Sequence, residues 1–193
     1  MLYVSISLIS GCSPRKATDL LFIYDAYNLG SWKTQSISQF IADSLSEFDL
    51  RSDLLRVGRE IQNCPDGNIP LGSVMNQADM ASVKYFTLTD MLKRIRRNSF
   101  TVENGARNPG EEIVVLFLDQ DQVINYETFQ EAKLLKSSVD VFYVVIIGNH
   151  SRAQFFADLA GEGYFLQINS YDHLPSLTTS LKNDLCEFLS SVV

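Results

Sequence analysis

The sequence predicts an α/β fold: a three-layer, doubly wound domain whose mostly parallel sheet of about six strands, one of them an antiparallel edge, carries helices on both faces. Two observations support this class. Short apolar runs rich in β-branched residues alternate along the chain with stretches of helical period, an order typical of a parallel sheet covered by helices. No repeat, low-complexity segment or linker rich in Pro and Gly interrupts that alternation.

The expected central strands are the runs at residues 20–24, 113–118 and 141–147, which are continuously hydrophobic. Central strands of a parallel sheet are buried on both faces and have this composition. Residues 55–62 and 164–168 are the other expected strands, whereas residues 65–80 show no regular pattern. The three apolar runs therefore define the expected core.

Two long stretches have apolar residues at spacings of three and four, which marks helices with one face on the sheet. The first contains Ile37, Phe40, Ile41, Leu45 and Phe48, and the second contains Leu174, Leu177, Leu181, Leu185 and Phe188. Shorter helices are expected at residues 89–97, 126–136 and 152–160. Helices therefore separate most of the expected strands.

The length indicates a single domain. A chain of 193 residues, 46% of them hydrophobic, can bury one substantial core but is too short for two ordinary domains. We expect this domain over residues 12–193. The apolar opening, residues 1–11, is short and lacks a basic start, so it is interpreted as a signal remnant or as an N-terminal edge segment. Residues 9–12 also resemble a lipoprotein box, which is the weaker alternative.

The charge balance argues against two classes of partner. The formal net charge is -7, so the chain has no surplus of cations with which to bind nucleic acid or an anionic membrane. The one basic cluster, at residues 93–97, is expected to be a solvated helix surface. The longest apolar runs are far shorter than the roughly 18 residues that a membrane helix needs. We expect no membrane span and no nucleic-acid partner.

The cysteines and one sequon bear on the compartment. Cys12 precedes the first strong strand and Cys186 lies in the last expected helix, so a disulfide between them would tie the two ends of the domain together. Cys64 is left over, as a free thiol or as an intermolecular link. An N-glycosylation sequon begins at Asn149. These features favour a secreted, extracellular protein.

Four stretches resemble, in order and spacing, the motifs of the von Willebrand factor A domain. Residues 25–31 stand where that family has D-x-S-x-S, although only Asp25 matches. Gly105-Ala106-Arg107 and the strand that ends at Asp119 are similar to its GAR turn and its strand ending in T-D-G. Residues 141–149 resemble V-F-x-V-G-I-G-N, and residues 163–186 resemble the closing aromatic strand and the helix that leads to a cysteine.

The resemblance implies an extracellular adhesion or matrix module. Many members of the family hold a divalent cation that binds an acidic residue of the partner, and such ions prefer oxygen ligands. Carried over to this sequence, the metal ligands are Asp25, Thr87 and Asp119, whereas Tyr27 and Leu29 stand in place of the two serines. We therefore expect a degenerate site with no cofactor, or with weakly bound Mg²⁺, Mn²⁺ or Ca²⁺.

The same oxygens have a structural interpretation, which we favour. Asp25 and Asp119 end neighbouring strands and can cap nearby amides, and Thr87 can act as a helix N-cap. On this interpretation the surviving oxygens serve the fold and hold no metal.

One enzymatic alternative rests on Asp119 and Asp121, because a hydrophobic strand followed by D-x-D is typical of metal-dependent phosphotransferases of the haloacid-dehalogenase type. That fold needs its aspartates near the first strand, and here they follow a strand in the middle of the chain. The sequence has no dinucleotide or P-loop glycine motif and no nucleophile elbow, and His150 and His173 are isolated in expected loops. We therefore predict that the protein is not an enzyme.

The functional prediction is an extracellular protein–protein interaction module, which recognises a matrix or cell-surface protein through the loops after its strands and lacks a complete metal site. A purely structural or assembly domain of a larger matrix protein is the second hypothesis. The phosphotransferase is the third.

Overall fold

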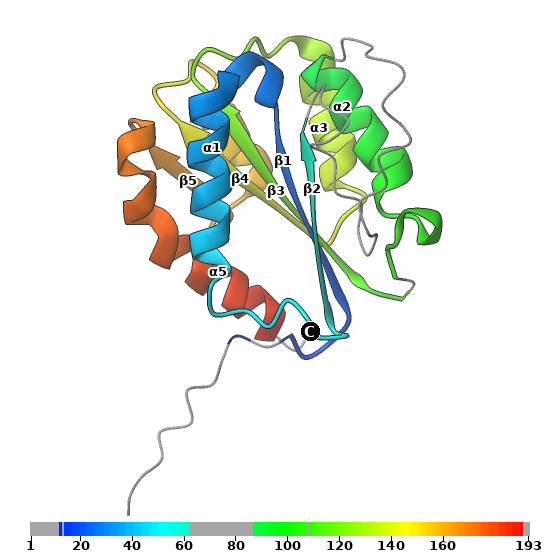
Figure 1. The fold of residues 1–193 in the computed structure, drawn as a ribbon. Helices are drawn as coiled ribbons and strands as arrows, with labels where there is room; N and C mark the ends of the chain where they lie inside the picture. Colours follow the sequence, from blue (N-terminus) through cyan, green and yellow to red (C-terminus); the bar gives the residue numbers. More distant parts are fainter. Residues whose placement is uncertain (1–11, 13, 62–86, 108, 191–193) are drawn as a thin grey trace, which may run out of the picture.

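A parallel sheet of five strands is the middle layer of the structure, a computed structural model that describes residues 12, 14–61, 87–107 and 109–190 (Figure 1). The strands are β1 (Thr18–Tyr24), β2 (Leu55–Ile61), β3 (Glu111–Asp119), β4 (Val141–Ile147) and β5 (Phe165–Ile168). Their order across the sheet is β2-β1-β3-β4-β5, and every neighbouring pair is parallel. All carboxyl ends therefore meet at one edge, called the upper edge below.

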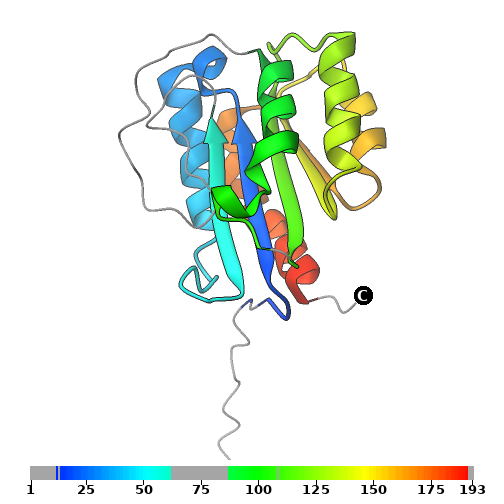
Figure 2. The same ribbon diagram turned by 90° about the vertical axis from the view of Figure 1, so that its right-hand side faces the viewer.

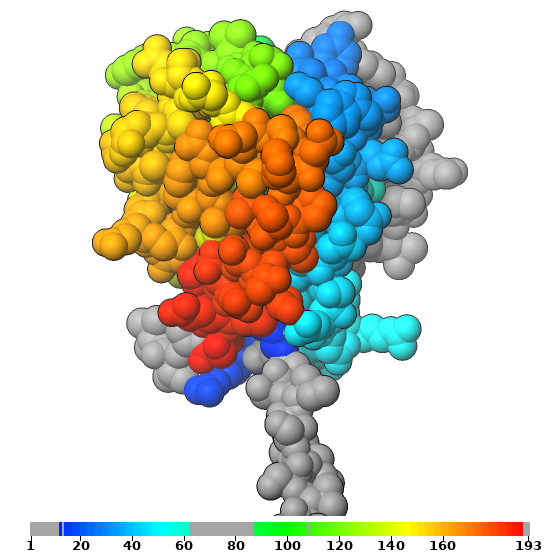
Figure 3. All heavy atoms as spheres, turned by 90° about the vertical axis from the view of Figure 1, so that its left-hand side faces the viewer, coloured from blue at the N-terminus to red at the C-terminus, as the bar shows by residue number. Residues whose placement is uncertain are grey.

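Helices cover both faces of this sheet. They are α1 (Ala26–Ser44), α2 (Leu88–Arg94) with its π-helical continuation η3 (Ile95–Ser99), η4 (Val102–Asn104), α3 (Tyr126–Lys136), α4 (Ala153–Ala160), η5 (Tyr171–Leu177) and α5 (Thr178–Ser190). Figure 2 shows α1 on one side of the sheet and α2 and α3 on the other. Figure 3 shows η5 and α5 beside α1. Among the described residues, no helix is both long and apolar enough to cross a membrane.

The side chains of β1 alternate between two hydrophobic cores. Leu20, Phe22 and Tyr24 pack toward α1 and α5, whereas Leu21 and Ile23 pack toward α2 and α3. All five side chains are buried. Burial of one such side chain contributes roughly 1.5–3 kcal/mol, so a continuous apolar run is most stable in the middle of the sheet, with a helix layer on each side.

The predicted α/β class, with helices on both faces, is confirmed, and the differences are local. The helix expected at residues 89–97 begins at Leu88 and ends in the π-helical turn at Ser99. The expected sheet of about six strands differs from the observed one, because the described residues contain five strands and no antiparallel edge. Residues 1–11, the irregular segment 65–80 and Cys64 lie outside the described residues.

The strand order reverses direction between β1 and β3. From β1 the chain enters α1 on one face, and from β3 it continues to α3 on the other face. In open α/β sheets, the carboxyl ends of two such strands flank the crevice where ligands bind. Asp25 and Asp119, both buried, stand at the ends of these two strands. The topology therefore directs attention to this part of the upper edge.

At the lower edge, Arg107 ties three segments together. Its backbone N–H donates to Asp19 Oδ2 at 2.7 Å, and its guanidinium lies 2.9 Å from Asp19 Oδ1, on a carboxylate with no exposed surface. The same guanidinium donates to the carbonyls of Thr18, Asp53 and Leu54. The arginine of the GAR turn thus joins the amino end of β1 to the loop that precedes β2.

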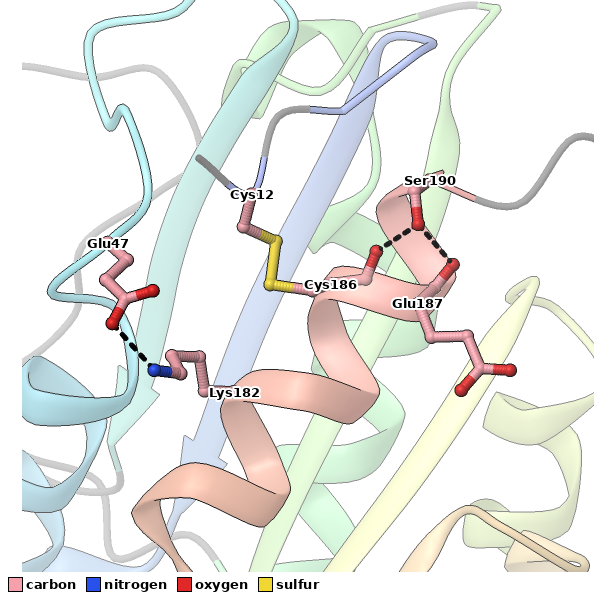
Figure 4. The surroundings of a disulfide bond; sticks show 6 residues. All are labelled: Cys12, Glu47, Lys182, Cys186, Glu187 and Ser190. Carbon is pink, nitrogen blue, oxygen red and sulfur yellow. Dashed lines mark hydrogen bonds and ion pairs between the residues drawn. A yellow bond between two sulfur atoms is a disulfide. The ribbon is translucent and has the colours of Figure 1, made fainter. Parts of the chain in front are cut away.

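The structure links Cys12 to Cys186 through a disulfide between the segment before β1 and helix α5 (Figure 4). The two Cα atoms are 5.2 Å apart, although 174 positions separate the residues in sequence. A backbone hydrogen bond of 3.0 Å from Arg15 N to Leu189 O joins the same two segments. The two ends of the domain are therefore fastened together, as the sequence predicted.

Candidate functional site

Asp25 caps the helix that follows β1. Its Oδ1 accepts a hydrogen bond from the backbone N–H of Asn28 at 3.2 Å, and its Oδ2 accepts one from Asn28 Nδ2 at 2.5 Å. A carboxylate in this position satisfies amides of the first helical turn and opposes the positive end of the helix dipole. Asp25 is therefore engaged by its own helix.

Gly30 divides α1 and sets the direction of the side chains before it. Its φ of 73° lies in the left-handed region that favours glycine, so the first turn is offset from the long helix that follows. Leu29 points into the core, and Tyr27 has 57% of its surface exposed. At the two positions where the resemblance expects serine hydroxyls, the structure thus places a buried aliphatic side chain and a solvent-exposed aromatic one.

Asp119 is the centre of the hydrogen-bond network at the upper edge. Its Oδ2 accepts from the Tyr171 hydroxyl at 2.6 Å and from Lys33 Nζ at 3.1 Å, and its Oδ1 accepts from the backbone N–H of Asp121 at 2.9 Å. The backbone N–H of Asp119 donates to Gln122 Oε1 at 2.8 Å. Helix α1, the loop after β3 and η5 therefore converge on one carboxylate that is only 3% exposed.

The network holds Asp119 and Lys33 in their charged forms. Burial favours the neutral acid, but the hydrogen bonds from Tyr171, Asp121 and Lys33 outweigh it and lower the pKa of Asp119. Burial also opposes the charge on Lys33, but the hydrogen bonds and charges of Asp119 and Asp121 outweigh that and raise its pKa. The pKa of Tyr171 is raised strongly, first by burial and then by its hydrogen bond to Asp119. Tyr171 therefore stays a hydroxyl donor across the physiological range.

Thr87, the third expected ligand, belongs to a different local structure. It is the N-cap of α2 in a capping box, where its Oγ1 accepts from the Asp90 N–H at 3.2 Å and Asp90 Oδ2 accepts from the Thr87 N–H at 3.0 Å. Its hydroxyl also donates to Asp90 Oδ2 at 2.8 Å. No hydrogen bond within the described residues links Thr87 to Asp25 or Asp119. The favoured N-cap role of Thr87 is thus the one that the structure shows.

The two histidines have structural contacts. His150 is buried, its Nδ1 accepts from the Arg152 N–H at 2.9 Å, and its Nε2 lies 3.0 Å from the Gln122 carbonyl. This arrangement joins the loops after β3 and β4. His173 Nδ1 lies 2.9 Å from Ser170 Oγ at the start of η5. Both side chains therefore stabilise loops at the upper edge.

The donor set does not fit a divalent cation. In the part of the chain that the structure describes, no group of three or more His, Cys, Asp or Glu side chains is placed to hold a metal ion. Leu29 has no oxygen, Thr87 is committed to Asp90, and both oxygens of Asp119 already accept hydrogen bonds. An ammonium bound to a carboxylate competes with Mg²⁺ for its oxygens and repels the ion at short range.

Sequence reasoning overlooked Lys33, Tyr171 and Trp32. The ring of Tyr171 lies 5.1 Å from the ring of Trp32 and 5.4 Å from Lys33 Nζ, so the three side chains pack together above Asp119. One signal was available for Lys33, because Lys33, Ile37 and Phe40 follow the helical spacing of the buried stripe of α1. A lysine in such a stripe indicates a buried anionic partner.

No protein-family model and no curated protein sequence matches the chain. Solved structures do: proximal thread matrix protein 1 from the mussel byssus superposes with a TM-score of 0.70 over 90% of this chain and 49% of that one, at 19% identity. The domain has the von Willebrand factor A fold. A second structure of the mussel protein, described with a zinc-occupied MIDAS motif (the metal-ion-dependent adhesion site), has a TM-score of 0.69 at 19% identity, over 90% of this chain and 49% of that one.

A bacterial adhesin has the same von Willebrand A fold. The pilus adhesin SpaC from Lactobacillus rhamnosus GG, in an open conformation, matches with a TM-score of 0.62 at 12% identity over 90% of this chain and 30% of that one. The chain thus spans about half the length of the mussel protein and less of the adhesin. At these identities the likeness concerns the fold, and the site has to be judged from this chain's own residues.

Proposed function

We propose that this von Willebrand A domain is an extracellular protein-interaction module of adhesion or matrix type, which contacts its partner through the loops at the upper edge and without a complete metal site. Three observations support the proposal. The structural neighbours are a byssus matrix protein and a pilus adhesin. The disulfide between Cys12 and Cys186 suits an oxidising compartment. The donor set around Asp119 does not fit a divalent ion.

A fourth observation, which carries the proposal, is the exposure of two aromatic side chains near the start of α1. Trp32 and Tyr27 each have 57% of their surface exposed, and the ring of Trp32 lies 5.1 Å from that of Tyr171, which donates to the buried Asp119. Tryptophan and tyrosine are the residues that most often dominate the binding energy of protein interfaces. The hydrogen-bond network beneath them holds this part of the upper edge rigid, which lowers the entropic cost of binding.

Surface plasmon resonance with the purified chain tests this proposal. Collagen, fibronectin, laminin and a second copy of the chain are passed over it in Mg²⁺ and again in EDTA. We expect saturable binding to at least one of them that persists in EDTA and weakens at least about tenfold in Trp32→Ala. Leu50→Ala is the matched control, because Leu50 is 54% exposed but lies in the loop before β2, away from the upper edge. Binding to none of them, or binding that EDTA abolishes, contradicts the proposal.

A structural or assembly role is supported by one observation, namely that the mussel neighbour is named as a thread matrix protein. On this alternative the chain self-associates or packs as a spacer, and the exposed surface at Trp32 binds no other protein. Sedimentation velocity over a range of concentrations distinguishes the two. Reversible oligomers that Trp32→Ala does not weaken, together with no binding to the matrix proteins, favour the assembly role.

The hydrogen bonds around Asp119 do not support the phosphotransferase alternative. Asp119, its nucleophile, is buried and its two oxygens already accept three hydrogen bonds, which oppose attack on an incoming phosphorus. Phosphatase activity with Mg²⁺ that disappears in both Asp119→Asn and Asp121→Asn would establish this alternative and remove the interaction proposal.

Asn149 is proposed as a glycosylation site at the same edge. The residue is exposed in the turn after β4, and its backbone N–H donates to Gln120 Oε1 at 3.3 Å. A glycan there would border the proposed contact surface. Protein secreted from a eukaryotic host should lose mass on treatment with an N-glycosidase, and no loss of mass refutes the assignment.

A further inference from the structure

We propose that Lys33 is the resident cation of this site: its ammonium takes, at Asp119, the place that a divalent metal takes in metal-binding domains of the same fold. The inference rests on the proposed function in one respect, because it explains how the upper edge keeps its shape without a complete metal site. Removal of the Lys33 ammonium should therefore leave Asp119 open to a divalent cation.

The contacts around Lys33 Nζ resemble those of a bound cation. Lys33 Nζ lies 3.1 Å from Asp119 Oδ2 and 3.4 Å from Asp121 Oδ2, and it lies over the ring of Tyr171 at 5.4 Å from its centroid. An ammonium has three N–H donors, and two carboxylates with an aromatic face account for this number of partners. The side chain of Lys33 is only 20% exposed, so the group is largely withdrawn from water.

The charges around the network require a cation. Asp25, Asp119 and Asp121 place three carboxylates at adjoining ends of β1 and β3, and a buried carboxylate without a counter-charge is strongly disfavoured. The partners described for Asp25 are the neutral amides of Asn28. Among the described residues, Lys33 is the cation that pairs with Asp119 and with Asp121. Lys33 therefore supplies from within the chain the positive charge that Asp119 and Asp121 share, while Asp25 is held by neutral amides.

A divalent ion would have to compete with this arrangement. Asp119 Oδ2 accepts from Lys33 and Tyr171, and Asp119 Oδ1 accepts from the Asp121 N–H. An ion at Oδ2 would have to displace one of its two donors, and an ion at either oxygen would meet the positive charge of the ammonium at short range. Lys33 thus opposes metal binding in two ways, by occupying an oxygen and by electrostatic repulsion.

Helix α1 accounts for the position of the lysine. The left-handed Gly30 ends the first turn and begins a new, continuous helix, in which Lys33 precedes Ile37 by four positions and Phe40 by seven. Ile37 and Phe40 are buried against the sheet, so Lys33 lies on the same face and reaches the end of β3. A lysine one position earlier or later would project from another face of the helix.

The absence of serine at positions 27 and 29 is a competing explanation for the lack of a complete metal site, and the experiment separates the two. Three variants are titrated with Mn²⁺ alone and followed by electron paramagnetic resonance. The double variant Tyr27→Ser/Leu29→Ser restores the hydroxyls and keeps the lysine. The triple variant adds Lys33→Ala. Its matched control adds Lys182→Ala instead, which removes a lysine of α5 that pairs with Glu47 in the turn after α1 (Figure 4).

We expect the triple variant with Lys33→Ala to bind Mn²⁺ saturably and at least about tenfold more tightly than the double variant or the Lys182→Ala control. Equal affinity in the double variant and the triple variant overturns the proposal, because the hydroxyls alone would then decide metal binding. Failure of the triple variant to bind Mn²⁺ overturns it as well.

Leu29 is buried, so the serine at that position is itself a risk to folding. Single variants provide a second test that avoids it. We expect Mn²⁺ to raise the melting temperature of Lys33→Ala, and to leave those of the wild type and of Lys33→Arg, which keeps the charge, unchanged. A rise in the wild type, or none in Lys33→Ala, contradicts the proposal. These measurements need no partner protein, so their failure is distinct from failure of the interaction assay.

Discussion

The disulfide between Cys12 and Cys186 is expected to contribute a large part of the stability of this domain. Because the two residues are 174 positions apart, the bond closes most of the chain into one loop in the unfolded state. In the chain-entropy model a loop of this length corresponds to about 5 kcal/mol, and removal of a native disulfide typically costs about 2–5 kcal/mol. We therefore predict that Cys12→Ala/Cys186→Ala loses about 2–5 kcal/mol of unfolding free energy.

The variant should nevertheless remain folded. Leu181, Leu185 and Leu189 of α5 are buried in the core, and the hydrogen bond from Arg15 N to Leu189 O does not depend on the disulfide. The helix therefore stays docked by burial of apolar surface. Stability falls mainly because the unfolded chain without the disulfide has more conformational entropy. For a domain of this size the midpoint of thermal unfolding should fall by very roughly 5–15 °C.

Urea unfolding measures the effect, with the fluorescence of Trp32, the only tryptophan of the chain, as the probe. Both proteins carry Cys64→Ser so that thiol exchange cannot occur. Lys182→Ala serves as a control on the same helix, since its ion pair with the exposed Glu47 is expected to contribute less than about 1 kcal/mol. An intact Cys12–Cys186 peptide in the parent, together with a loss no larger than that of the control, would refute the reasoning. Two free thiols in the parent would refute the bond itself.

Two further predictions concern charges at the lower edge. Arg107→Ala leaves Asp19 buried without its cation and should cost about 3–5 kcal/mol in urea unfolding, and a loss below about 1 kcal/mol contradicts the role assigned to the pair. Burial, with the charges of Asp140 and Asp19, raises the pKa of Glu112 to about 7. The folded state therefore holds this proton more tightly than the unfolded state, and wild-type stability falls as the pH rises from the ordinary carboxyl range to about 7. Glu112→Gln should thus be more stable than wild type by about 2 kcal/mol at pH 8 and equal to it at pH 4, and a difference that does not change with pH contradicts this assignment.

Local pattern was sufficient for the elements that bury apolar surface. The continuous run of β1 and the period of α1 each specify which side chains must leave water, and burial of those side chains is the main favourable term in folding. For the same reason Thr87 was identified as an N-cap, because capping depends on residues three positions apart. The described residues contain no antiparallel edge strand, and strand order and direction depend on pairing partners far apart in sequence.

The candidate site was predicted only in part. The residues that the sequence analysis missed, Lys33 and Tyr171, lie far from Asp119 in sequence. Asp25 and Asp119 were identified through the resemblance to the family's motifs, and each stands at the end of an apolar strand. Their partners differ in this respect: Asn28 is three positions from Asp25, whereas Lys33 is 86 positions and Tyr171 is 52 positions from Asp119. No spacing rule connects residues so distant, so the position of Lys33 in the apolar stripe of α1 indicates an anionic partner without naming which carboxylate it is.

The sequence by itself determined the layers of this protein, its central strands and the side chains at positions 27 and 29, where the resemblance expects serines, because hydrophobic period and residue chemistry are local properties. The tertiary structure decided which charge meets Asp119. That outcome depends on the strand order β2-β1-β3, on the restart of α1 after Gly30 and on η5 bringing Tyr171 to the same carboxylate. A buried carboxylate takes the cation that the fold places within hydrogen-bond distance, and here that cation is the ammonium of Lys33.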